Sequence, residues 1–131
     1  MTTKFRFSFA FFVGFLTICG TLFAHHGTNA SYDMEKQITI AGTVTEFVWS
    51  NPHCQIYVDV KDEKGELIHW GVETNSPGQL RTGGWNRDLI KPGDHITVTV
   101  FPSKAGTPAG VLSKITLADG RVMSRGQQAG Q

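Results

Sequence analysis

The sequence predicts an all-β fold: a small five-stranded barrel of the oligonucleotide/oligosaccharide-binding type, with one short helix between strands 3 and 4. Apolar and polar residues alternate through most of 37–123, and turns rich in glycine and proline separate the alternating stretches. A helix start follows the third stretch. Five bent strands can close a barrel and so hide their edges. An open sandwich of similar strand content is the alternative architecture.

The first predicted strand begins at residue 37. Ile40 and Val44 fall on one face, but the next large apolar residue, Phe47, has the opposite phase. A bulge of one residue at 45–46 would restore the alternation. Such bulges bend strands, which is what a small barrel requires.

The next two strands form a hairpin. A turn at 49–52 leads into the second strand, and the polar loop 62–65 ends in glycine and connects it to the third strand at 66–74. The first three strands therefore form a meander. Its inward residues on the second and third strands are expected to be Cys54, Ile56, Val58, Val60, Ile68, Trp70 and Val72.

A short helix is expected after the third strand. Ser76 is a suitable N-cap, Pro77 suits the first helical position, and the glycines at 83–84 end the helix. A turn at 91–94 then precedes the fourth strand, at 95–101. The fourth strand buries Ile96, Val98 and Val100, the fifth strand spans 111–117, and a disordered tail is expected over 124–131.

Residues 1–24 have the pattern of a secretory signal peptide. Lys4 and Arg6 precede an apolar run at 7–23, and Ala24 offers a small residue for cleavage before His25. The run is shorter and more interrupted than a spanning helix of ~20 residues, so an uncleaved anchor is the less favoured alternative. We therefore expect a periplasmic or secreted protein without a stable membrane span, in which 25–36 form an extended lead-in.

Removal of this leader would leave 107 residues, the size of one domain. Without Lys4 and Arg6 the chain keeps ten basic and eleven acidic side chains, so it lacks the concentrated positive charge of nucleic-acid-binding proteins. Cys54 would be the sole remaining cysteine, which excludes an internal disulfide.

Several short motifs resemble a family of short exported bacterial proteins, the domain of unknown function 6152 family. The most specific are His25-His26 and the Asn-Pro-His element that ends at His53. The resemblance implies export and a single domain, and it brings no established activity. The other motifs that carry it are Tyr32-Asp33, Gly42-Thr43-Val44, Trp49-Ser50, Trp70, Glu73, Gly84-Trp85 and Lys91-Pro92-Gly93-Asp94.

The histidines suggest a transition-metal site, most naturally for copper. After cleavage, His25 would offer its α-amino nitrogen and its imidazole as a chelating pair, and His53, on an outward face, is the best second ligand. His26 is the alternative. Nitrogen ligands suit Cu(II), which has the highest affinity in the divalent series.

A simpler interpretation also exists, since terminal histidines are often only solvated and His53 could merely cap its turn. Gly27 stands where the common amino-terminal copper motif has histidine. The second functional hypothesis is therefore a metal-free module that binds a ligand or a periplasmic protein. Its candidate contacts are Trp85, expected to be partly exposed, and Tyr57, on the outer face of its strand.

Catalysis is not expected. His69 and Glu73 share a strand face but lie ~13 Å apart at ~3.3 Å per residue. Cys54 has the inward phase of its strand, where a thiol is usually an inert core residue. The sequence contains no recognisable nucleophile triad or phosphate loop.

Overall fold

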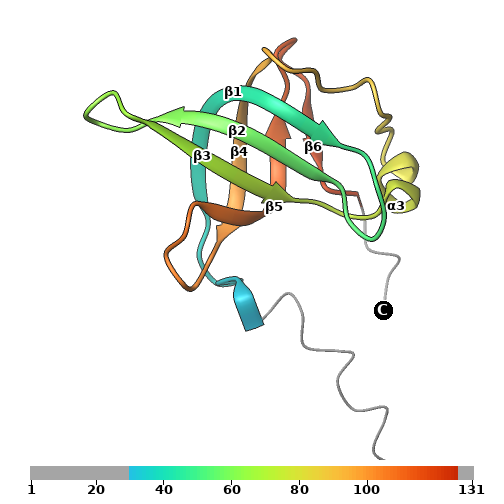
Figure 1. Cartoon of the computed structure of the whole chain (residues 1–131). Coiled ribbons are helices and arrows are strands. Elements are labelled where there is room, and N and C mark those ends of the chain that lie inside the picture. Colours follow the sequence, from blue (N-terminus) through green and yellow to red (C-terminus); the bar gives the residue numbers. More distant parts are fainter. Residues whose placement is uncertain (1–29, 127–131) are drawn as a thin grey trace, which may run out of the picture. The chain divides into compact units, whose positions relative to one another are not determined.

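The computed structural model describes residues 30–126, and Figure 1 shows their six strands and the helix α3. The predicted signal peptide, His25, His26 and the last five residues, 127–131, lie outside this part of the chain. None of the helices within 30–126 is both long and apolar enough to cross a membrane.

The strand β1 (Ile38–Val48) contains the predicted bulge. Its pairing with β2 (Gln55–Lys61) shifts by one residue between Val44 and Glu46, so that Phe47, beyond the bulge, packs against the core. Gly42 permits the close approach of β1 and β2, because a Cβ there would lie 2.3 Å from the Asp59 carbonyl oxygen. The change of hydrophobic phase in the sequence therefore marks a real irregularity in the strand.

The strands close into a barrel. Their order is β3 (Leu67–Glu73), β2, β1, β4 (His95–Pro102) and β5 (Ala109–Thr116). Parallel pairing of Gly71–Glu73 with Ala109–Val111 joins β3 to β5 and completes the ring. The all-β barrel with one short helix between strands 3 and 4 is thus confirmed.

The barrel interior contains most of the residues that alternation placed there. Val44, Cys54, Ile56, Val58, Val72, Ile96, Val98 and Val100 are buried as expected, Val60 and Trp70 are partly buried, and Leu112 and Ile115 of β5 are buried as well. Burial of such aliphatic side chains stabilises the fold by roughly 1.5–3 kcal/mol each. Because no disulfide is present in the described chain, this core provides the main stabilisation.

The helix α3 (Pro77–Thr82) begins as predicted. The Ser76 hydroxyl accepts a hydrogen bond from the Gln79 amide, and the Gln79 side chain accepts one from the Ser76 amide, which forms a capping box. Leu80 is fully buried and anchors the helix to one end of the barrel (Figure 1).

The expected exposure of Trp85 is wrong, because the residue is only 2% exposed. After Gly83 caps the helix, Gly84 adopts a positive φ and turns the chain so that the Trp85 amide donates to the Leu80 carbonyl. The indole centroid then lies 6.4 Å from that of Phe47. The flanking glycines suggested a surface position, but they turn the chain so that the indole ring packs in the core.

A sixth strand, β6 (Val122–Ser124), extends order beyond the expected end at Met123. It pairs with Lys114–Thr116, the part of the β5 edge that β3 does not cover. The Ser124 carbonyl accepts from Trp85 Nε1 at 3.0 Å, and the Arg125 carbonyl accepts from the side-chain Nδ2 of Asn75 at 2.7 Å. The expectation of a disordered tail from Ser124 is therefore wrong for residues 124–126, because this edge and these donors hold them.

The other deviation concerns Ile68, which has the inward phase but is 36% exposed. Since β3 meets β5 only from Gly71 onward, no described strand covers the preceding part of its edge. Ile68 and Trp70 consequently line an opening of about 530 Å³ between β3 and the β4–β5 loop.

Candidate functional site

His53 lies at the end of the barrel that carries α3. It directly precedes Cys54, whose amide and carbonyl extend the β2–β3 ladder by two further hydrogen bonds. The Cys54 amide donates to the Asn75 carbonyl at 3.0 Å, and the Thr74 amide donates to the Cys54 carbonyl at 2.9 Å. Cys54 points into the core, so the flanking His53 side chain faces outward, as alternation predicts.

Glu73 is the partner of His53. It pairs with Gln55 in the β2–β3 register and is therefore a diagonal neighbour of His53 on the outer face. Nδ1 of His53 lies 2.7 Å from Oε1 of Glu73, and the His53 side chain is 46% exposed. An ionised carboxylate can only accept, so Nδ1 carries the proton, and in the neutral imidazole Nε2 keeps its lone pair. This is the form in which a histidine binds a metal through Nε2.

Tyr32 completes this cluster from a distant part of the sequence. Its hydroxyl donates to Oε2 of Glu73 at 3.4 Å, whereas Oε1 faces His53. Burial raises the pKa of the Tyr32 hydroxyl, and the negative charge of Glu73 and the hydrogen bond to it raise the pKa further. The hydroxyl therefore stays protonated at neutral pH and remains a donor.

The other two described histidines have different partners. His69 Nδ1 contacts Asp59 across the β2–β3 ladder, and His95 Nδ1 lies 3.0 Å from the Thr43 hydroxyl oxygen. His69 and Glu73 are not in contact, in agreement with the distance expected along β3. These separate surroundings make His69 and His95 useful controls for His53.

Within residues 30–126, no three His, Cys, Asp or Glu side chains converge as a metal site. His53 and Glu73 offer a single imidazole and a carboxylate already used as its partner. The other predicted ligands, His25 and His26, lie outside the described part of the chain. A copper site centred on His53 would therefore need further donors from outside residues 30–126.

The buried Cys54 has the environment of a core residue. Burial raises the pKa of its thiol, which outweighs the opposite effects of the Ser50 amide and the positive charge of Arg81. The Arg81 guanidinium carbon lies 5.6 Å from the ring centroid of Trp49, which places a charged and an aromatic side chain together. A buried thiol with a raised pKa is not activated as a nucleophile.

Tyr57, the other predicted ligand contact, lies on the outer face and is 40% exposed. It pairs with Gly71, and an added Cβ at Gly71 would lie 3.7 Å from the Tyr57 ring. The ring thus lies beside a residue without a side chain, and it lines neither of the two concavities considered in this section and the preceding one.

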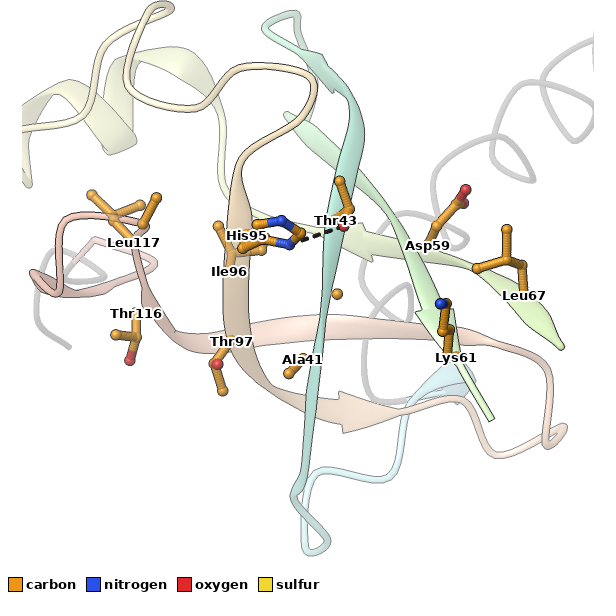
Figure 2. Close-up of a pocket in the computed structure, with 12 residues that line it drawn as sticks. Ala41, Thr43, Asp59, Lys61, Leu67, His95, Ile96, Thr97, Thr116 and Leu117 are labelled. Carbon is orange, nitrogen blue, oxygen red and sulfur yellow. Dashed lines mark hydrogen bonds between the residues drawn. The ribbon is translucent and has the colours of Figure 1, made fainter. Parts of the chain in front are cut away.

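A wider concavity, of about 670 Å³, lies elsewhere on the outer surface (Figure 2). Its floor is β1, whose outward residues there, Ala41 and Thr43, are small. Figure 2 shows Asp59 and Lys61 on one side of β1 and His95 and Thr97 on the other. Neither His53 nor Tyr57 lines it.

The sequence contained a signal for the His53–Glu73 pair that hydrophobic alternation alone did not reveal. A hairpin loop at 62–65 fixes the register, and the register puts Gln55 opposite Glu73. His53 then follows as a diagonal neighbour. Tyr32 carried no comparable signal, because its contact with Glu73 spans 41 residues.

The family model for the family of unknown function DUF6152 matches residues 14–113. The chain belongs to the DUF6152 family. A comparison with curated proteins finds no match. The matched residues include Tyr32, His53 and Glu73, so all three side chains of this cluster lie within the part of the chain that matches the family.

Proposed function

We propose that this DUF6152 protein is exported and binds a Cu(II) ion through His53 and the amino-terminal His25. The observation that supports this most is the Glu73–His53 pair, which leaves Nε2 of a half-exposed imidazole available as a ligand. A carboxylate on the second ring nitrogen orients metal-binding histidines and increases their basicity. The protein acts as a binding protein rather than an enzyme in this proposal.

His25 supplies the remaining donors. Cleavage after Ala24 would free its α-amino group, which together with the imidazole gives two nitrogen ligands, and His53 gives a third. His26 is the alternative donor from the same segment.

The test replaces each described histidine in the mature protein that starts at His25. We expect His53→Ala to weaken Cu(II) binding by about 100-fold or more, since loss of a ligand exceeds the 10–100-fold effect of losing an orienting partner. Isothermal titration calorimetry measures the affinity.

His69→Ala and His95→Ala are the matched controls, because both imidazoles also have an occupied Nδ1 but lie away from Glu73. Both variants should retain the original affinity. Equal losses in all three variants would show that His53 has no special role.

The concavity on β1 favours a second candidate, a metal-free module for a small polar ligand. Three threonines, Thr43, Thr97 and Thr116, line it, and the opposite charges of Asp59 and Lys61 lie on one side. Such a lining suits a neutral polyhydroxyl solute, because hydroxyl groups both donate and accept hydrogen bonds.

This candidate predicts that metal-free protein responds to a panel of mono- and disaccharides. Amide chemical-shift changes in nuclear magnetic resonance (NMR) spectra should concentrate at Thr43, His95 and Thr97. Ala41→Trp fills the floor of the concavity and should abolish them, while Tyr57→Ala, outside it, should not. Absence of localised changes across the panel would contradict this second function.

A further inference from the structure

The first part of β3 has an edge that no described strand covers. β3 pairs with β2 along its whole length but with β5 only at Gly71–Glu73, so Leu67–Trp70 have a neighbouring strand on one side only. Figure 1 shows this part of β3 in the β2–β3 hairpin, which projects past the other strands. An edge of this kind presents unpaired backbone groups to other chains.

The pairing of Gly71 shows which backbone groups face this edge. The Gly71 amide points away from β2, because it donates to the Pro108 carbonyl at 3.1 Å. Alternate residues of a strand direct their backbone groups to the same side, so the N–H and C=O groups of Leu67 and His69 also point to the uncovered edge. No strand within residues 30–126 pairs with these four groups.

The opening of about 530 Å³ lies beside the uncovered edge, and its volume falls in the range of about 300–1,000 Å³ that is usual for ligand pockets. Its apolar lining consists of Ile38, Ile68, Trp70, Pro102 and Pro108. Since side chains alternate between the two faces of a strand, an extended chain along the edge of β3 would direct every second side chain into this opening.

The ionisable residues that line the opening favour an acidic occupant. They are Asp33, Lys36 and Lys104, which gives two positive charges to one negative charge. Oδ1 of Asp33 also accepts a hydrogen bond from the Glu35 amide at 3.2 Å. A chain that carries carboxylates therefore complements this lining better than a basic chain does.

We propose that the uncovered edge of β3 binds an extended, acidic peptide segment of another protein by strand addition. The peptide pairs with the backbone groups of Leu67 and His69, places an apolar side chain beside Ile68 and Trp70, and brings carboxylates near Lys36. In strand addition the backbone hydrogen bonds provide affinity, and pockets for alternate side chains provide specificity. The edge and Glu73 lie at opposite ends of β3, so this site is independent of the proposed copper ligand His53.

A second copy of this chain fits the same edge less well than a flexible peptide. Antiparallel self-pairing that uses all four backbone groups sets Leu67 of one copy opposite His69 of the other. The same register then sets Gly65 of the second copy opposite Gly71, where β5 already pairs. Gly65 belongs to the hairpin loop, because its amide donates to the Asp62 carbonyl. The loop would therefore meet β5, whereas a peptide can end or turn away there.

The test uses two synthetic heptapeptides with blocked ends, one of alternating valine and glutamate and one of alternating valine and lysine. NMR titration of the protein should show amide shift changes concentrated at Leu67–Trp70 and at 104–108. The glutamate peptide should bind about tenfold more tightly than the lysine peptide. Absence of peptide-dependent changes at Leu67–Trp70, or tighter binding of the lysine peptide, would overturn the proposal.

Two N-methylated forms of the glutamate peptide test the backbone pairing directly. A strand directs the N–H groups of alternate residues to opposite edges, so methylation of the glutamate nitrogens blocks one edge and methylation of the valine nitrogens blocks the other. One form should lose affinity about tenfold or more, the expected cost of losing two hydrogen bonds, and the other should not. Equal affinities of the two forms would exclude strand addition.

Protein variants locate the same contacts on β3 and in the opening. His69→Pro removes an N–H that faces the uncovered edge, where proline is compatible with a strand, and should weaken binding of the glutamate peptide. His69→Thr removes the imidazole, keeps the N–H and should retain binding. Lys36→Glu should also weaken binding, whereas Lys114→Glu, on β5 and outside the opening, should not.

Sedimentation velocity of the protein without peptide distinguishes the other occupant. We expect a monomer. A dimer that His69→Pro dissociates and His69→Thr does not would assign the edge to a second copy and overturn the proposal. Loss of peptide binding in both His69 variants would also contradict it, because the backbone N–H would then have no specific role.

Discussion

Mature protein that starts at His25 is expected to bind one Cu(II) ion at least about 100-fold more tightly than the same protein with three alanines added before His25. Three are used because one or two would place His26 or His25 third from the terminus, where the common amino-terminal copper motif has histidine. The added residues convert the α-amine of His25 into an amide. An amide nitrogen is no longer a basic donor, so the chelating pair loses one of its two nitrogens. The factor follows from the 10–100-fold cost of losing only an orienting partner. Calorimetry and the electron paramagnetic resonance spectrum of Cu(II) measure affinity and the number of nitrogen ligands.

A second extended protein with His-Ala-Ala added before His25 serves as the control. This variant restores a terminal histidine with a free amine, displaced by three residues along the chain, and keeps histidine out of the third position. It should recover much of the affinity that the three alanines remove. Equal copper affinity in the protein that starts at His25 and in its alanine-extended form would refute the terminal site.

Trp85→Ala is expected to reduce the free energy of unfolding by about 3–5 kcal/mol, the usual cost of truncating a buried aromatic residue. Trp85 is 2% exposed, packs near Phe47 and donates to the Ser124 carbonyl of β6. Typical domains are stable by only about 5–15 kcal/mol. Urea unfolding followed by circular dichroism measures the change.

Two further variants make this result specific. Tyr57→Ala removes the other predicted ligand contact, which is 40% exposed, and should cost about 1 kcal/mol or less. Trp85→Phe keeps most of the apolar volume but removes the Nε1 donor, so a loss between those of the two alanine variants is expected even if Trp85→Ala does not fold. A loss below about 1 kcal/mol for both Trp85 variants would contradict the core position.

Most of the barrel could be predicted because its determinants act over short distances along the chain. The phase change at Phe47 indicated the β1 bulge, the loop at 62–65 indicated the β2–β3 hairpin, and Ser76-Pro77 indicated the start of α3. Each is a relation between residues a few positions apart, so local steric and hydrogen-bonding rules apply.

Three features escaped that approach. The burial of Trp85 depends on Phe47 and on β6, the order of Ser124 depends on an uncovered part of the β5 edge, and the exposure of Ile68 depends on where β5 stops pairing with β3. The partners in the first and third cases lie more than 35 residues away, whereas β6 pairs with β5 residues that are near in sequence but whose edge is open only because β3 does not cover it. Alternation assigns a side chain to a face of its strand, but it does not specify whether another element covers that face.

The residues of the candidate site were also only partly predictable from local sequence patterns. Residue types and alternation indicated His53 as an outward histidine beside a turn. Its pairing with Glu73 required the β2–β3 register, and the contribution of Tyr32 required closure of the barrel between β3 and β5.

The sequence by itself determined the all-β barrel, the bulge in β1, the capped helix and the outward direction of His53, since periodicity and turn chemistry operate between near neighbours in the chain. Tertiary structure alone decided that Tyr32 meets Glu73, that Trp85 is buried and that β6 is ordered. These contacts depend on the distance between segments remote in sequence, and closure of the barrel is what makes that distance short.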